Sequence, residues 1–167
     1  MFRELRRKKQ LLSQKECEAI LTEETSGVLA LAGDDDYPYA VPISYVYDGG
    51  KIFFHSAKSG HKLDAIRRNP KASFCVISQD LIVPEEYTTY FRSVIAFGRI
   101  RVLEEDSEKR DAIEKLAAKY SPGETAEDRT QAIEREWKPL CMLEMTIDHL
   151  TGKEAIELVR KKKQDSL

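Results

Sequence analysis

The chain has 167 residues, of which 41% are hydrophobic and 34% are charged, a balance typical of folded globular proteins and not of disordered ones. Its formal net charge of −2 provides no global positive field, which argues against a protein that binds nucleic acid or an anionic membrane. The three cysteines include no Cys-x-x-Cys pair, so no disulfide framework is expected and a reducing compartment fits.

The chain shows no internal repeat and no low-complexity linker, so we treat residues 1–167 as one domain with an N-terminal helix and a C-terminal tail. No apolar stretch is long enough to span a bilayer, and the charged N-terminus lacks the apolar core of a signal peptide. We therefore expect a cytoplasmic protein. The basic clusters at the two ends, Arg3 to Lys9 and Arg160 to Lys163, are most simply solvated termini because no aromatic platform accompanies them.

Hydrophobic periodicity and turn chemistry predict a series of short strands and helices. In chain order we expect a helix over 13–24, strands over 27–32, 37–47 and 51–56, a helix over 60–69, strands over 71–77 and 90–102, helices over 107–120 and 125–137, and a strand over 140–150. Residues 78–88 have the composition of a polar loop. The tail 154–163 fits a helix and a strand equally well.

Local signals define the ends of several elements. Ser13 followed by Glu16 is a capping box at the start of the first helix, and Ser107 is the expected N-cap of the third. The Asp-Gly-Gly sequence between two strands predicts a tight hairpin turn. We therefore expect the strand 51–56 to pair back on 40–47.

The predicted fold class is mainly β with flanking helices. About six strands, mostly in hairpin order, favour an antiparallel barrel with helices packed outside it. No Gly-x-Gly-x-x-Gly follows a strand, which argues against a doubly wound nucleotide-binding fold. Pro42 cannot donate a ladder hydrogen bond, so it belongs at a sheet edge or a bulge, and Gly98 predicts a bulge or a close backbone approach. The free edge would suit a flat heterocycle, or Pro42 simply protects an edge strand from aggregation.

Residues 51–62 are the stretch with the most chemistry. An apolar strand ends in small polar residues and a helix begins at once, so the first helical N–H groups point outward with partial positive charge. Ser56 and Ser59 add hydroxyls, and Lys58 and Lys62 add full charges. This arrangement can hold a phosphate group. A solvated strand-to-helix turn is the simpler alternative.

Other kinds of site have less support. His55, His61 and His149 show no ligand spacing and the cysteines are scattered, so we expect no metal site. No Gly-x-Ser-x-Gly motif supports a Ser-His-Asp hydrolase. A protonated His61 beside Lys62 at a helix start would favour a bound anion. The tyrosines of the strand 37–47 form either cross-strand pairs or a dimer interface.

Several motifs occur in a defined order: Gly27-Val-Leu-Ala-Leu31, Pro38-Tyr-Ala-Val-Pro-Ile-Ser-Tyr45, the Asp-Gly-Gly hairpin, Ile52-Phe-Phe-His-Ser-Ala57, Gly60-His-Lys62, Asn69-Pro70, Ser93-Val-Ile-Ala-Phe-Gly98 and Ile147-Asp148 with Thr151-Gly-Lys153. As a set they resemble the pyridoxamine 5′-phosphate oxidase-like superfamily, and within it the nitroimidazole-reductase-like flavoproteins. The resemblance implies an FMN-binding split β-barrel that forms a homodimer, with the cofactor at the subunit interface.

The resemblance also implies which residues contact FMN. These are Val41, Pro42, Ile43, Ser44, Tyr45, Val46, His55, Ser56, Ala57, His61, Lys62 and Ser93. In this assignment the strand 41–46 lines the flavin ring chiefly through backbone groups. His55 and Ser56 approach the ribityl chain or phosphate, and His61 and Lys62 hold the phosphate. Ser93 reaches the flavin, either within the subunit or from its partner.

The chain departs from the oxidase pattern in two places. The basic residue that the oxidase carries at the position of Val41 is missing, and the chain has no equivalent of the oxidase's C-terminal substrate-binding arginine motif. The resemblance therefore favours the reductase-like branch over oxidation of pyridoxamine phosphate.

The function implied by the resemblance is an oxidoreductase that moves electrons from a reduced nicotinamide through FMN to a small acceptor such as a nitro compound. Because the flavin supplies the electron transfer, no catalytic side chain is assigned. One alternative is a non-catalytic flavin or haem carrier on the same barrel, in which His61 could be a haem ligand. A further alternative is an interaction protein in which residues 51–62 form only a turn.

Overall fold

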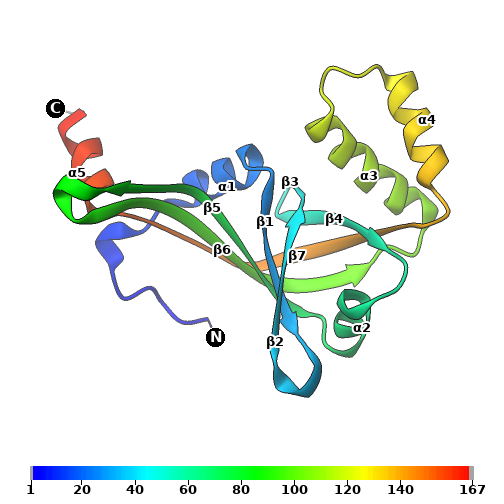
Figure 1. Cartoon of the computed structure of the whole chain (residues 1–167), viewed down its shortest axis with the longest axis horizontal. Helices are drawn as coiled ribbons and strands as arrows, with labels where there is room; N and C mark the ends of the chain where they lie inside the picture. The colour runs from blue at the N-terminus through cyan, green and yellow to red at the C-terminus, as the bar shows by residue number, and fades with distance from the viewer. Residues whose placement is uncertain (1, 166–167) are drawn as a thin grey trace.

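In the computed structural model of the protein, which describes residues 2–165, seven strands form one antiparallel sheet in the order β2-β1-β5-β6-β7-β4-β3 (Figure 1). The strands are β1 (Ser26–Ala32), β2 (Pro38–Ser44), β3 (Val46–Asp48), β4 (Lys51–Ala57), β5 (Lys71–Val83), β6 (Thr88–Val102) and β7 (Leu140–Glu154). The helices are α1 (Gln14–Glu23), α2 (His61–Arg68), α3 (Asp106–Tyr120), α4 (Ala126–Glu136) and α5 (Ile156–Asp165), with 3₁₀ turns η1 (Lys8–Gln10), η2 (Asp34–Asp36) and η3 (Pro84–Glu86). The predicted class, mainly β with flanking helices, is confirmed, with seven strands in place of about six.

The two edge strands of this sheet, β2 and β3, are consecutive in the chain and separated only by Tyr45. β2 pairs with β1, whereas β3 pairs with β4. One short segment, 38–48, therefore forms both edges of the sheet and curves it into a split barrel. The predicted unbroken strand 37–47 is wrong at Tyr45. The pairing of the strand 51–56 back on 40–47 is confirmed only at the hairpin, where residues 51–53 pair with 46–48, since residues 38–44 pair with β1 instead. The alternation of residues marked the strand correctly, but alternation does not specify which strand pairs with it.

Tyr45 is fully buried at the point where the chain changes edge. Its backbone N–H donates to the hydroxyl of Tyr120 at 3.0 Å, and that hydroxyl donates to the carbonyl of Thr25. The ring of Tyr45 packs edge-on against Phe74, with 4.8 Å between ring centroids. Because Tyr120 belongs to α3, one hydroxyl joins the corner of the barrel to the helix that follows β6.

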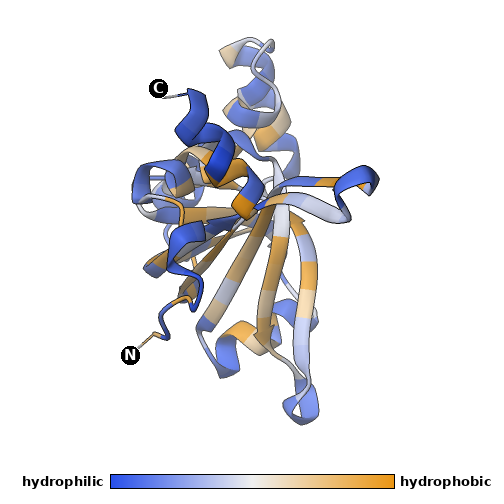
Figure 2. Cartoon of the chain, turned by 90° about the vertical axis from the view of Figure 1, so that its left-hand side faces the viewer, coloured by the Kyte–Doolittle hydropathy of each residue, from blue (hydrophilic) through white to orange (hydrophobic). Residues whose placement is uncertain are grey.

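Two apolar clusters hold the layers together. The larger fills the barrel and packs against α1 and α2, and its fully buried members include Leu21, Phe54 and Phe74. The smaller lies between α3 and the β3-β4-β7 part of the sheet, around Val46 and Leu116. Fully burying an aliphatic or aromatic side chain contributes roughly 1.5–3 kcal/mol, so each cluster stabilises the helices that it contacts. Figure 2 shows the apolar residues along the strands and the polar surface of α5.

Glycines allow two close backbone geometries. A Cβ at Gly98 would lie 2.0 Å from the carbonyl oxygen of Thr146, and the register between β6 and β7 shifts at this point. The predicted bulge and close approach at Gly98 are both confirmed. Gly49 and Gly50 have φ angles of 54° and 83° in the turn between β3 and β4, which confirms the Asp-Gly-Gly hairpin.

The predicted polar loop over 78–88 is wrong, because β5 and β6 continue through it and reverse at η3. This long hairpin projects away from α3 and α4, on the side of α5 (Figure 1). A two-stranded ribbon outside the core needs no buried face, so its sequence lacks the alternation that identifies a strand.

The ends of the helices agree with the local signals except in α3. Ser13 caps α1, and its capping box with Glu16 is present. The helix α3 begins at Asp106 with Glu105 as N-cap and no side-chain cap bond, so the cap predicted at Ser107 is wrong. Ser107 lies inside the first turn, where acidic neighbours suit the helix dipole without a cap. The undecided tail forms α5.

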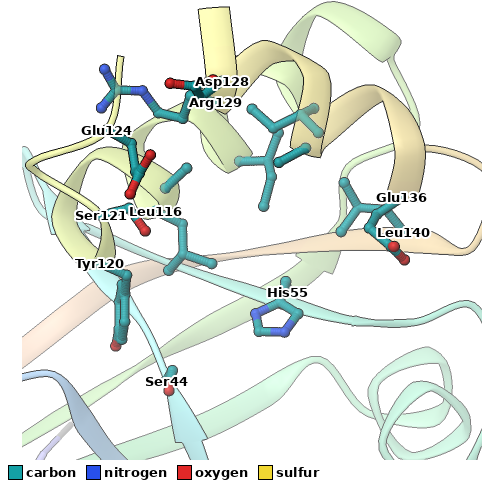
Figure 3. Close-up of a pocket in the computed structure, with 14 residues that line it drawn as sticks. Ser44, His55, Leu116, Tyr120, Ser121, Glu124, Asp128, Arg129, Glu136 and Leu140 are labelled. Atoms are coloured by element: carbon teal, nitrogen blue, oxygen red, sulfur yellow. The ribbon is translucent and has the colours of Figure 1, made fainter. Parts of the chain in front are cut away.

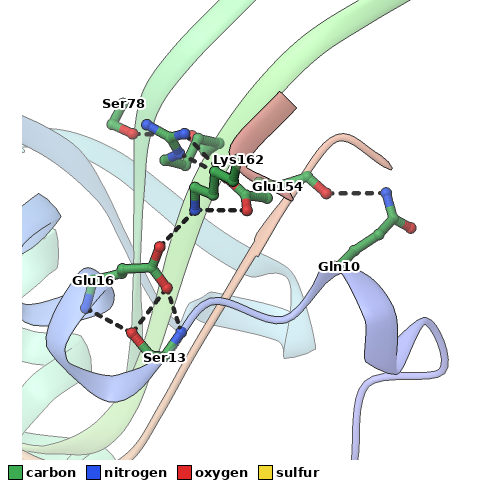
Figure 4. Close-up of polar contacts among 7 residues, drawn as sticks. Gln10, Ser13, Glu16, Ser78, Glu154 and Lys162 are labelled. Atoms are coloured by element: carbon green, nitrogen blue, oxygen red, sulfur yellow. Dashed lines mark hydrogen bonds and ion pairs between the residues drawn. The ribbon is translucent and has the colours of Figure 1, made fainter. Parts of the chain in front are cut away.

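A buried polar network attaches α5 to the rest of the protein (Figure 4). Glu154 is 3% exposed and accepts hydrogen bonds from Arg92 at 3.0 Å and Lys162 at 2.7 Å. Lys162 also donates to Glu16 at 2.5 Å. The Lys162 ammonium and the backbone N–H of Ser13 lower the pKa of Glu16 from 4.5 to about 2. The network therefore joins α5 to α1 through one lysine.

The first prediction concerns acid stability. Glu16 has a lowered pKa when folded, so its ion pair stabilises the protein above pH 4.5 and the stabilisation is lost as pH falls toward about 2. The variant Glu16→Gln should unfold at lower urea than the wild type at pH 7, and the difference should shrink steadily between pH 4.5 and 2. Glu23→Gln, on the same helix, is the control and should show no such trend. A difference that stays constant with pH would contradict the assignment.

The second prediction concerns the barrel corner. Tyr120→Phe removes the acceptor of the Tyr45 N–H and leaves that group unpaired, which should lower the free energy of unfolding by about 1–3 kcal/mol. Urea denaturation followed by circular dichroism measures this change. The control is Tyr87→Phe, since the Tyr87 side chain is 98% exposed and its variant should unfold like the wild type. Equal stability of the two variants would show that the corner does not depend on this bond.

Candidate functional site

The segment after β4 brings two of the predicted phosphate ligands together. Gly60, with φ of 122°, is the N-cap of α2, and no side chain caps the first turn. The ammonium of Lys62 donates to the hydroxyl of Ser56 at 3.4 Å. Partial burial lowers the pKa of Lys62, so this cation is not simply a solvated surface lysine. An ammonium, a hydroxyl and uncapped helical N–H groups thus lie at one point, as anion binding requires.

His61 lies next to Lys62 in sequence but has different neighbours. Its ring stacks on Tyr39 with 4.0 Å between centroids and an interplanar angle of 22°. Its Nε2 lies 3.5 Å from a carboxylate oxygen of Asp34, and Arg68 also contacts that carboxylate at 2.9 Å. His61, the first residue of α2, therefore faces Tyr39 and Asp34 near the start of β2. It is adjacent in sequence to Lys62, one of the predicted phosphate ligands, but its ring contacts a different set of residues.

The strand that was predicted to line the flavin ring, residues 41–46, contains two kinds of position. Val41 and Ile43 pack against the barrel core, whereas Pro42 is exposed and Ser44 half-buried on the opposite face. β2 is an edge strand, as predicted from Pro42, and pairs only with β1 in residues 2–165. Its outer edge therefore presents backbone N–H and C=O groups to a ligand. Tyr45 and Val46 are buried, so they could contact a ligand only through their backbone.

A cavity of about 580 Å³ lies between the barrel and the α3–α4 hairpin (Figure 3). Ser44 and His55 project into it from β2 and β4, and the helices form the opposite wall. The helical and C-terminal lining residues are Ile113, Leu116, Ala117, Tyr120, Ser121, Glu124, Asp128, Arg129, Ala132, Ile133, Glu136 and Leu140. Its volume is in the range of small-molecule sites. No local motif signals this cavity, because its walls come from segments that are distant in the chain.

A second hollow, of about 410 Å³, lies beside α2 and contains three cations that the sequence analysis did not bring together: Lys58, Arg67 and Lys109. Lys109 is only 7% exposed, and its ammonium donates to the carbonyl of Trp137 at 2.9 Å. Burial lowers the pKa of Lys109, and the nearby Lys58 lowers it further. Glu104 and Asp106 also line this hollow, so its cations exceed its carboxylates by one, and we name it the basic cleft. Lys109 comes from α3, so spacing along the chain could not reveal it.

Of the predicted cofactor residues, Ser93 lies apart from this group within one chain, whereas Ala57 directly follows Ser56. Ser93 lies in β6, opposite Ile77 of β5 and Lys153 of β7, and it lines neither hollow. Ala57 is exposed at the end of β4. The site formed by a single chain therefore includes the β2 edge, His55, Ser56, His61 and Lys62, and Ser93 lies elsewhere on the sheet.

Residues 2–165 contain neither a candidate metal-ion cluster nor a candidate membrane-spanning helix. No group of three or more histidine, cysteine, aspartate or glutamate side chains is arranged there to hold a metal ion. None of the helices there combines the length and the apolar character needed to cross a membrane.

The chain is similar to proteins of one family over most of its length. The model of the family described as pyridoxamine 5′-phosphate oxidase matches residues 13–154. An uncharacterized protein of Rhizobium meliloti (strain 1021) is 31% identical over 93 residues, which cover 56% of this chain and 56% of that protein. The chain thus spans about half the length of this curated relative.

Solved structures share the fold. An FAD-binding protein of Mesorhizobium loti matches with a TM-score of 0.65 and 26% identity, over 87% of this chain and 97% of that one. A candidate 5-nitroimidazole antibiotic resistance protein of Bacteroides thetaiotaomicron matches with a TM-score of 0.72 and 18% identity, over 86% of each chain. An FAD and heme binding protein of Mycobacterium smegmatis matches with a TM-score of 0.71 and 22% identity, over 88% of this chain and 73% of that one. These likenesses confirm the split β-barrel.

Proposed function

Because this chain belongs to the pyridoxamine 5′-phosphate oxidase family, we propose that it binds FMN and is an oxidoreductase that reduces a small acceptor such as a nitro compound. The observation that carries the proposal is the contact between Lys62 and Ser56 at the uncapped start of α2, beside the free edge of β2. When bound, the flavin would supply electron transfer between a reduced nicotinamide and the acceptor. The residues of this chain would bind, orient and shield it.

The phosphate end of FMN would lie at Lys62, Ser56 and His61. A phosphate oxygen can replace the hydroxyl of Ser56 as the partner of the Lys62 ammonium, and the first N–H groups of α2 point to the same place. His61, when protonated, adds positive charge at the border of this group. Ala57, exposed at the end of β4, has no Cβ branch that would block the approach.

The ring end would lie along the outer edge of β2. The flavin ring carries donor and acceptor groups along one edge, and residues 41–44 offer complementary backbone groups along the free edge of β2. The backbone N–H and C=O of Tyr45 already bond the hydroxyl of Tyr120, and Val46 belongs to β3, so these two residues would lie beside the ring without bonding it. Ser44 and His55 lie between this edge and the cavity, so both side chains would border the ring. Neither residue is assigned a catalytic role.

FAD is the second candidate cofactor, and the basic cleft favours it. Lys58, Arg67 and Lys109 outnumber Glu104 and Asp106 there, so the cleft keeps a net positive charge that would suit a second phosphate. The similar protein of Mesorhizobium loti is an FAD-binding protein. A carrier without turnover, of flavin or of haem, remains the alternative function. Mass spectrometry of the cofactor released from the purified protein distinguishes FMN, FAD and haem.

We also propose that the protein is a homodimer with the flavin at the subunit interface. Val28 is 39% exposed and Ile77 62% exposed, and both lie on the face of the sheet opposite the barrel core. Ser93 pairs directly with Ile77 and therefore lies on the same face. If two copies meet on this face, Ser93 of one subunit can reach the flavin of the other. The tyrosines of the strand 37–47 contribute less than predicted, because only Tyr37 among them is exposed.

The third prediction tests the phosphate site. Lys62→Ala should weaken FMN binding by about 1–3 kcal/mol, or about 5- to 150-fold, because a charge-assisted bond to phosphate is lost. Quenching of flavin fluorescence during titration of flavin-free protein measures the affinity. Lys71→Ala, an exposed lysine at the start of β5, is the matched control and should bind FMN like the wild type.

Two outcomes would count against the proposal. A purified protein that carries no flavin absorbance and binds no added FMN or FAD would rule out a flavoprotein. Flavin binding without any turnover of a nitroaromatic and reduced nicotinamide would favour the carrier over the oxidoreductase.

The fourth prediction tests the interface. Ile77→Asp places a charge on the exposed apolar face and should convert the dimer to a monomer in sedimentation velocity, with loss of flavin as well. Tyr37→Asp changes an exposed aromatic residue elsewhere and should leave the dimer intact. A wild-type protein that sediments as a monomer while retaining flavin would refute the shared site.

A further inference from the structure

We infer that the cavity under the α3–α4 hairpin is a binding site for a flat, apolar molecule that is neutral or cationic, and that this hairpin selects against anionic substrates. The inference rests on the proposed function in one respect, since it takes the occupant to be the molecule reduced next to the flavin. It goes beyond that function by assigning the substrate class and the element that recognises it.

The first argument is the composition of the walls. Leu116, Ile133 and Leu140 are buried and form an apolar surface from α3, α4 and the start of β7. Ala117 and Ala132 lie between them and leave the volume of about 580 Å³ open. A mostly apolar space of this volume between a helical pair and a sheet fits an aromatic ring system better than a highly hydrated molecule.

The second argument is the pair of polar groups on the barrel side. In Figure 3 the side chains of Ser44 and His55 lie on the barrel side of the cavity, opposite the helices, and they are its only lining residues from β2 and β4. Within residues 2–165, the side chain of His55 makes no hydrogen bond or ion pair, so its ring nitrogens are open to an occupant. An apolar site with a few convergent polar groups is the usual form of a small-molecule site.

The third argument is the distribution of charge. The mouth of the cavity carries Glu124, Asp128, Glu136 and a single cation, Arg129. Glu136 pairs with the neighbouring Arg135 at 3.7 Å, so Glu124 and Asp128 still outnumber Arg129 at the mouth.

The cations near the site lie elsewhere. Lys58, Arg67 and Lys109 line the basic cleft, and none of them lines the cavity. Anions are therefore drawn to the basic cleft and the phosphate ligands, whereas the cavity mouth repels them. The two hollows meet at Leu140, which lines both. The cofactor phosphate would therefore lie in positively charged surroundings, and the acceptor would lie behind a negatively charged mouth.

The test uses three probes built on the same bicyclic ring: 1-methylquinolinium, quinoline and quinoline-2-carboxylate, which are a cation, a neutral molecule and an anion at pH 8. Their binding to the purified flavin-containing protein is measured by equilibrium dialysis. We expect the cation and the neutral probe to bind and the anion to bind at least about tenfold more weakly, a difference of roughly 1.4 kcal/mol.

Matched variants locate the site. Ala132→Trp places a bulky ring in the cavity and should weaken the binding of quinoline about tenfold or more. The control Gln131→Trp makes the same insertion at the adjacent exposed position, which does not line the cavity, and should bind quinoline like the wild type. Glu124→Lys reverses one charge at the mouth and should reduce the preference for the cation over the anion.

The outcomes separate this inference from the proposed function. Flavin content is read from the absorbance of every sample, so a protein that lacks flavin refutes the proposed function whatever the probes do. A protein that contains flavin refutes the inference if the anion binds as tightly as the cation, or if Ala132→Trp binds quinoline unchanged. Competitive displacement of quinoline by added FMN would also overturn it, because the cavity would then be the flavin site itself.

Discussion

The change of sheet edge at Tyr45 is the constraint on which the rest of the structure depends. A single buried residue separates β2 from β3, so the first and last strands of the sheet are fixed to each other by one peptide segment. The barrel is therefore curved without being closed by a ladder of hydrogen bonds between its edges. The edge of β2 keeps its unpaired backbone groups, and an edge of this kind is either protected or used for binding.

Buried carboxylates hold the helices that surround this barrel. Glu144 of β7 accepts from Lys51 at 3.0 Å and from Arg101 at 3.0 Å, and Arg101 also pairs with Glu108 of α3 at 2.7 Å. Glu154 plays the same part for α5 at the other end of β7. Removing one partner of a buried charge leaves the other uncompensated, so such contacts fix one arrangement more strongly than their net stabilisation suggests. The helical wall of the cavity is thereby held against the sheet.

The features that were predicted correctly are those set by neighbouring residues. The capping box of Ser13, the Asp-Gly-Gly turn and the junction from Ser56 to Lys62 all involve groups within a few positions of each other. The partner of β2 could not be predicted, because pairing depends on how the whole sheet closes. Lys109 could not be assigned to the basic cleft, since it is brought there by α3. The contact proposed between Ser93 and the flavin would need a second copy of the chain, and the local sequence carries no signal for such a contact.

This contrast divides the site into two parts with different origins. The proposed phosphate end of the site is formed by one continuous segment that runs from β4 into α2. Its geometry therefore follows from a strand, a turn and the start of a helix that succeed one another in the chain. The cavity is formed where α3 and α4, which connect β6 to β7, cover the barrel, and it shares only Ser44 and His55 with the proposed cofactor residues. Substitutions facing the cavity from α3 and α4 can therefore alter its shape and charge while leaving Ser56 and Lys62 in contact. Under the proposed function, recognition of the cofactor and recognition of the acceptor would then be independent properties of the same barrel.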